Sequence, residues 1–72
     1  MNRHWYIAFQ TINGVEVRSG FYVYEGDRPH TYDITVALNK FFNVSITIIT
    51  TMFEISTDDY NKYPEFCKLY LT

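Results

Sequence analysis

Two alternating runs on either side of Asn13-Gly14 constrain the fold of this chain more than any other feature. The large apolar residues of both runs occupy odd positions: Trp5, Ile7 and Phe9 before the turn, and Val15, Val17, Phe21 and Val23 after it. Side chains of a strand alternate between its two faces, so runs of one parity can share one face of a hairpin. The pattern predicts an N-terminal β-hairpin with an odd-numbered apolar face.

The length of the loop decides whether odd positions pair with odd ones. A two-residue loop at Asn13-Gly14 would pair odd with even positions and split the apolar face. A three-residue loop over residues 12–14, with Gly14 left-handed as a G1 bulge, pairs Phe9 with Val17 and keeps the parity. We therefore expect the bulged hairpin, with one shared core: Trp5, Phe9, Val17 and Phe21.

Helical spacing follows the hairpin. Between about Thr31 and Phe42 the apolar residues recur three and four positions apart, as on a helix that covers a sheet. These residues are Ile34, Ala37, Leu38, Phe41 and Phe42. Asp33 near the start and Lys40 near the end match the helix dipole.

Residues 44–55 are β-branched or aromatic almost throughout, which predicts a long strand. Alternation fails over residues 48–51, so either a bulge switches the parity there or both faces of the strand are covered. Ser56 then forms an expected N-cap with Asp59 in a capping-box position, and Pro64 interrupts that helix. In residues 65–72 the spacing of Phe66, Leu69 and Tyr70 predicts a short helical turn docked on the core.

The order of elements predicts an α+β fold in a single domain over residues 1–72. The third strand runs antiparallel to the first, so it completes an antiparallel sheet most simply by lying beside it. We expect a two-layer sandwich of ββαβ order: a three-stranded antiparallel sheet in the order 2-1-3, one helix on one face, and a short helical tail.

Composition excludes several functional classes. Six Lys and Arg against eight Asp and Glu give a net charge of −2 without a run of either sign, which suits neither a nucleic-acid binder nor a DNA mimic. His4, His30 and the single Cys67 lack a catalytic or metal-ligand spacing, so we expect no enzyme, no metal and no cofactor. One cysteine and no long apolar stretch predict a cytoplasmic protein with no membrane contact.

The expected register leaves even-numbered side chains on a face without a helix. Tyrosine and arginine are favoured at interfaces, because they combine broad contact area with polar tips. The candidate binding residues are Tyr6, Gln10, Glu16, Arg18, Tyr22 and Tyr24. Two simpler interpretations stay open: these tyrosines are ordinary strand formers, or the C-terminal tail covers them.

Three functions could use such a face. The leading hypothesis is a protein-binding module. A second is a weak single-stranded nucleic-acid-binding domain in which bases stack on the tyrosines, although Arg18 and His4 are its only cationic candidates. A third is a symmetric homodimer through the same patch.

The chain also resembles a known group in its layout. Trp5-Tyr6-Ile7-Ala8-Phe9, the Asn13-Gly14 turn, a helix, and a β-branched strand closed by Phe53-Glu54-Ile55-Ser56 are similar to small proteins of bacteriophages, prophages and other mobile elements. The resemblance covers nearly the whole chain. It implies an inhibitor that binds a bacterial host complex and occludes it, as anti-CRISPR and other anti-defence proteins do.

Overall fold

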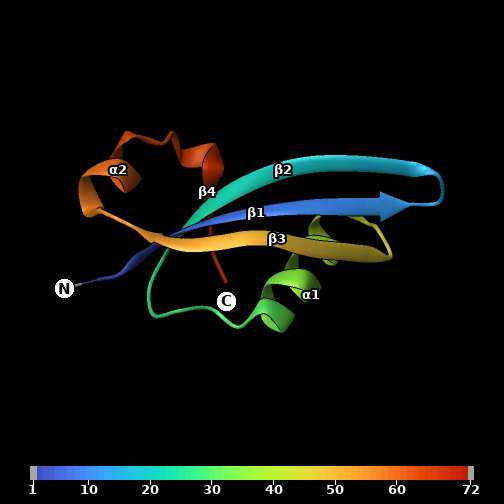
Figure 1. Ribbon diagram of the computed structural model, residues 1–72, viewed down its shortest axis with the longest axis horizontal. Helices are drawn as coiled ribbons and strands as arrows, with labels where there is room; N and C mark the ends of the chain where they lie inside the picture. The colour runs from blue at the N-terminus through green and yellow to red at the C-terminus, as the bar shows by residue number, and fades with distance from the viewer. Residues whose placement is uncertain (1, 72) are drawn as a thin grey trace.

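Residues 2–71 are described by the computed structural model, and they form four strands, two α-helices and one 3-10 turn. Their order along the chain is β1 (His4–Asn13), β2 (Glu16–Glu25), α1 (Thr31–Phe42), β3 (Ile46–Ile55), α2 (Thr57–Lys62), the 3-10 turn (Glu65–Cys67) and β4 (Lys68–Leu69). Figure 1 shows α1 and α2 on opposite sides of the sheet, with α2 at the end farthest from the β1–β2 turn. The α+β class, the ββαβ order and the bounds of α1 are as predicted.

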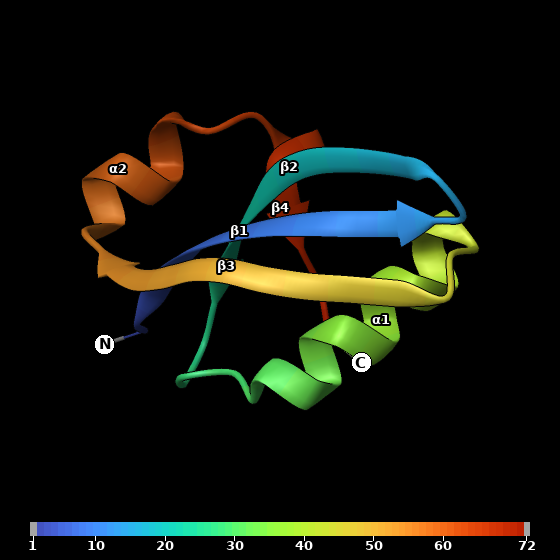
Figure 2. The ribbon, with the colours of Figure 1, turned by 45° about the vertical axis from the view of Figure 1, so that its right-hand side comes forward.

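The sheet has the order β3-β1-β2-β4 (Figure 2). β1 lies between β2 and β3 and pairs antiparallel with both, which matches the expected arrangement of the first three strands. The prediction of a three-stranded, purely antiparallel sheet was wrong, because β4 adds a fourth strand parallel to β2. Leu69 and Leu71, two positions apart, pack against the core, so the tail continues as extended chain after its 3-10 turn. Thr72, the last residue of the expected tail, lies outside the described residues.

The register of the β1–β2 hairpin also differs from the prediction. Asn13 pairs with Glu16, which leaves Gly14 and Val15 as a two-residue loop, and Phe9 pairs with Gly20 rather than Val17. Gly14 does have the expected positive φ, 65°, but at the first position of a two-residue loop, where a type II′ turn requires it. Odd positions of β1 therefore pair with even positions of β2, and every side chain of β2 lies on the face opposite to the one expected.

Gly20 explains in part why this register is favourable. A Cβ atom at Gly20 would lie 2.9 Å from Cζ of Phe9, so the absent side chain makes room for the Phe9 ring. The ring is buried and stacks on Tyr22, with 5.6 Å between the ring centroids. In the expected register the partner of Phe9 would carry a side chain where this ring lies.

Gly20→Val is accordingly expected to lower the free energy of unfolding by about 1–3 kcal/mol, because the added atoms overpack a buried ring. Chemical denaturation measures the change. Ser19→Val, one position earlier and on the other face, is the matched control and should be neutral or slightly stabilising. Equal stability of both variants would contradict the contact between Phe9 and residue 20.

The core lies between α1 and the face of the sheet that carries odd-numbered β1 residues. Its buried members are Trp5, Ile7, Phe9, Ile34 and Leu38. α1 ends at Phe42 and is capped by Asn43, whose φ of 54° is a left-handed conformation that asparagine tolerates well. The predicted apolar stripe is buried only in part, since Phe41 remains 72% exposed.

β3 contains a bulge, which is one of the two alternatives that the irregular 48–51 stretch left open. Phe9 pairs with Ile49 and Ala8 with Thr51, so Thr50 is the extra residue. From that point the parity of β3 switches. The N-cap of α2 is also confirmed, because the Ser56 hydroxyl oxygen accepts a 3.1 Å hydrogen bond from the amide of Asp59.

Candidate functional site

The face of the sheet opposite α1 carries an uncharged and largely apolar surface, which we call the open face. Direct cross-strand pairing places ten residues on it. They are Ala8, Gln10 and Ile12 from β1, Val17, Ser19 and Phe21 from β2, and Ile46, Ile48, Thr51 and Phe53 from β3. None of the ten carries a charge.

Large apolar side chains on the open face are well exposed to solvent. Val17 is 57% exposed, Ile46 50%, Phe53 49% and Ile48 45%. Single exposed apolar residues are common on soluble proteins, whereas a contiguous and uncharged patch marks a site of interaction. A sheet face of this kind is normally covered by a second layer.

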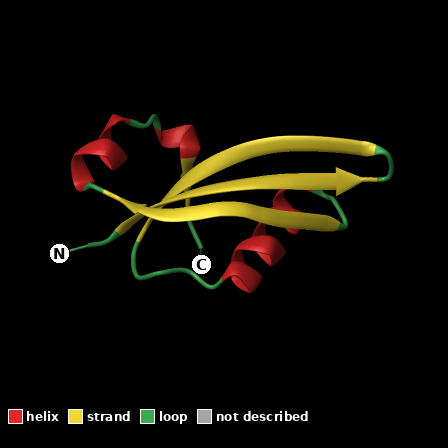
Figure 3. Ribbon diagram, in the orientation of Figure 1, coloured by secondary structure: helices red, strands yellow, loops and turns green. Residues whose placement is uncertain are grey.

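One end of this sheet face is already covered. Tyr6 stacks on Phe21 and Phe53, with centroid separations of 5.3 and 5.0 Å, and Tyr63 contacts the edge of the Phe21 ring. α2 adds Tyr60, which packs on His4 at 4.4 Å. Figure 3 shows that α2 stops there and that no helix among the described residues covers the same side toward the β1–β2 turn.

The six predicted binding residues do not share a face. Tyr6 and Gln10 lie on the side of the open face, but the four residues from β2 lie on the α1 side because of the changed register: Glu16, Arg18, Tyr22 and Tyr24. Glu16 and Arg18 form an exposed ion pair with each other. The expected single tyrosine face was therefore wrong, because a shift by an odd number of residues moves every β2 side chain to the other side.

Tyr22 and Tyr24 are packing residues in this arrangement. Both pack against the buried core, and Tyr22 also contacts Phe42 and Phe41 of α1. Burial raises the pKa of the Tyr22 phenol, with a smaller contribution from Cys67, because a phenolate is poorly solvated there. Neither tyrosine offers a free aromatic surface on the open face.

His4, considered above as a cation beside the tyrosines, is buried under α2. Its Nε2 lies 2.9 Å from a carboxylate oxygen of Glu25, and Nδ1 lies 3.4 Å from the hydroxyl of Thr57. Burial raises the pKa of its neighbour Tyr60, with smaller effects from the carboxylates of Glu25 and Glu65. Through these contacts His4 holds α2 against the sheet.

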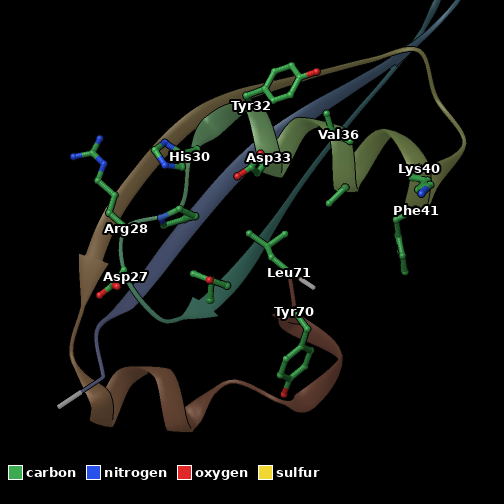
Figure 4. A pocket seen from close by; sticks show the side chains of 13 residues that line it. Asp27, Arg28, His30, Tyr32, Asp33, Val36, Lys40, Phe41, Tyr70 and Leu71 are labelled. Atoms are coloured by element: carbon green, nitrogen blue, oxygen red, sulfur yellow. The ribbon is translucent and has the colours of Figure 1, made fainter.

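A groove of about 910 Å³ runs between α1 and the C-terminal segment (Figure 4). Its lining includes apolar Val36 and Leu71 but also charges of both signs. Figure 4 shows Arg28, Asp33 and Lys40 distributed along it. At its end Tyr70 donates a hydrogen bond to Glu65, which raises the pKa of that phenol to about 12. Mixed charges of this kind are typical of solvated surface, so the groove is a weaker candidate than the open face.

Residues 2–71 form neither a metal-binding cluster nor a membrane-spanning helix. In this part of the chain, no group of three His, Cys, Asp or Glu side chains gathers where it could hold a metal ion. No helix built from these residues is long and apolar enough to cross a bilayer.

Sequence reasoning missed most of the open face, including its most exposed members Val17 and Ile46. The available signal was in residues 46–55, where β-branched and aromatic residues occupy both faces of the strand. A strand that is apolar on both sides needs cover on both sides, while residues 2–71 supply only one long helix.

Comparison with known proteins adds no assignment: no family model, curated protein or solved structure matches the chain.

Proposed function

We propose that this protein is a non-enzymatic protein-binding module and that a folded partner docks on its open face. The observation that carries this proposal is the set of ten neighbouring uncharged residues, with large apolar side chains up to 57% exposed. Burying such a surface releases water without desolvating a charge, which favours association. The partner that fits is a protein with an equally uncharged, apolar surface.

The layout resemblance supplies the biological setting of the proposal. A small phage-type protein that covers an apolar surface of a bacterial host complex would inhibit that complex by occlusion. Tyr6 and Gln10 remain binding residues in this proposal, since they border or belong to the open face. Phe21, Val17 and Ile48 replace the β2 tyrosines as the expected anchors.

Val17→Glu tests the proposal, because it places a charge on the open face, in the row nearest the β1–β2 turn, while altering an exposed side chain. Val15→Glu is the matched control, since Val15 is 104% exposed in the turn, outside the open face. A tagged protein is used to capture partners from bacterial lysate, and the affinity for each captured protein is then measured. We expect Val17→Glu to weaken binding at least about tenfold, since an unpaired charge is costly to bury, and Val15→Glu to leave it unchanged.

Salt dependence provides an independent check. Apolar contact should vary little between low and physiological salt, and no binding to DNA or RNA oligonucleotides is expected. The proposal would be refuted by a partner that binds the folded Val17→Glu variant normally. Salt-sensitive oligonucleotide binding that Arg18→Ala abolishes would favour the nucleic-acid hypothesis instead.

A further inference from the structure

The outer edge of β3 has no partner strand among residues 2–71. β3 is ten residues long, lies at the edge of the sheet and pairs on its inner side with β1. Residues 46–53 contain no charge, no proline and no glycine. Natural proteins usually protect an edge strand with charges, proline or a bulge, because its free backbone groups are a template for another strand. Of these three devices, residues 46–53 contain only the bulge at Thr50.

The hairpin shows which backbone groups of β3 point outward. Asn13 and Glu16 close a two-residue loop, so they form a hydrogen-bonded pair, and odd β1 residues bond toward β2. The 2.8 Å bond from the amide of Gly26 to the carbonyl of Arg3 continues this series. Even β1 residues therefore bond to β3, and the β3 residues that do not face them point outward. Apart from the bulged Thr50, these are Thr47, Ile49, Met52 and Glu54.

The bulge makes this outward set symmetric about the peptide bond between Thr50 and Thr51. Reflection about that bond exchanges Thr47 with Glu54 and Ile49 with Met52. In an antiparallel pair of identical strands, bonded residues must both point toward the partner. Only the register centred between Thr50 and Thr51 satisfies all four outward residues at once.

We propose that two copies of this chain pair antiparallel through β3 in this register, with the two-fold axis between Thr50 and Thr51. The side chains are compatible with the register that the backbone favours. Ile48 then lies opposite Phe53 of the second copy, both on the open face, and Ile46 lies opposite Ile55. Glu54 lies opposite an uncharged Thr47, so no like charges meet. A regular strand of another protein lacks the matching bulge, which favours a second copy as the occupant.

This pairing goes beyond the proposed function and uses a different part of β3, its backbone edge rather than its exposed side chains. The two sheets would join into one of eight strands, and the two open faces would become one uncharged, largely apolar surface. A dimer of this form would present two docking sites to a partner.

Disulfide formation tests the register directly. In a Cys67→Ser background, one sample of Ile48→Cys protein is mixed with one of Phe53→Cys protein under mild oxidation. Directly opposed, non-bonded residues lie about 4.5 Å apart between Cα atoms, within the reach of a disulfide. We expect cross-linked dimer in the mixture at several times the yield of either variant alone. A mixture of Ile46→Cys and Phe53→Cys, two positions out of register, should give little.

Glu54→Pro tests the role of the edge without changing the core. Proline removes the outward N–H of residue 54, whereas Glu54→Ala keeps it, and both variants lose the exposed ion pair with Arg3. Sedimentation over a range of concentrations should show a dissociation constant at least about tenfold higher for Glu54→Pro than for Glu54→Ala, since bonds are lost on both sides of the two-fold axis.

Three results would overturn the inference. One is a monomer at every concentration, and another is preferential cross-linking of the offset pair. The third is a dimer that Val17→Glu abolishes and Glu54→Pro leaves intact, because the copies would then pair through their open faces. Failure of partner capture with an intact β3 dimer would instead refute only the proposed function.

Discussion

Phe9→Ala is expected to lower the free energy of unfolding by about 3–5 kcal/mol, through lost burial and the cavity that remains. Phe9 is 5% exposed. Its ring packs on Tyr22 and Phe42 and fills the space that a side chain at Gly20 would occupy, so few neighbours can move into the cavity that Phe9→Ala would leave. Equilibrium denaturation in urea measures the loss. For a domain of this size a loss of this magnitude is a large part of the total stability.

Phe66→Ala provides the matched control for that measurement. Phe66 is 81% exposed, so the same change of side chain should alter the stability by no more than about 0.5 kcal/mol. Comparable losses at both positions would mean that Phe66 is buried as deeply as Phe9, which would contradict its exposed place in the tail.

The double substitution of Tyr22 and Tyr24 by alanine is expected to cost about 4 kcal/mol and to leave much of the protein unfolded. Both rings pack against the core on the α1 side, and Tyr22 links Phe9 to the end of α1. Circular dichroism and thermal denaturation would detect the loss. The reason for the large effect is the register, which turns these two side chains toward α1.

Val17→Ala serves as the comparison from the opposite face of the same strand. Val17 is 57% exposed on the open face, and its truncation should cost well under 1 kcal/mol. A folded and stable double tyrosine variant would show that β2 presents its tyrosines to solvent, and the proposed open face would then be buried instead.

The open face and the β3 edge are linked by the composition of one strand. Ile46, Ile48 and Phe53 supply side chains to the face, while Thr47, Ile49 and Met52 direct backbone groups to the edge. Apolar residues on both sides of an edge strand are unusual unless both sides are covered. Within the described chain, α1 covers one side of β3, and the other side and the edge are free for partners.

Local sequence patterns were sufficient to predict the long strands and the helices themselves. Helical spacing placed α1 at its observed bounds, and Ser56 was identified as an N-cap. The failed alternation near Thr50 left two alternatives, of which the structure has the bulge. These features depend on residues within a few positions of one another, so their physical causes are visible in a short window. Trp5, Ile7 and Phe9 were likewise placed correctly in the core.

The register of the hairpin could not be predicted from local sequence patterns. Val17 and Phe21 have the parity of the core residues, but pairing depends on the loop type and on whether the Phe9 ring has space on the partner strand, which Gly20 provides. A change of one position in the pairing exchanges the two faces of a strand. The local apolar pattern of β2, with large residues on both faces, fits either choice.

The α+β class, the central position of β1 and the helix that covers it were predictable from the sequence, because these follow from short-range periodicity and chain direction. Which side chains face solvent was not predictable in this way, since that depends on contacts between residues distant along the chain. Packing of Phe9 over Gly20 turns Tyr22 and Tyr24 inward and leaves Val17 and Phe21 outward. The surface available to a partner is therefore a consequence of strand register, a property that no single segment of the chain contains.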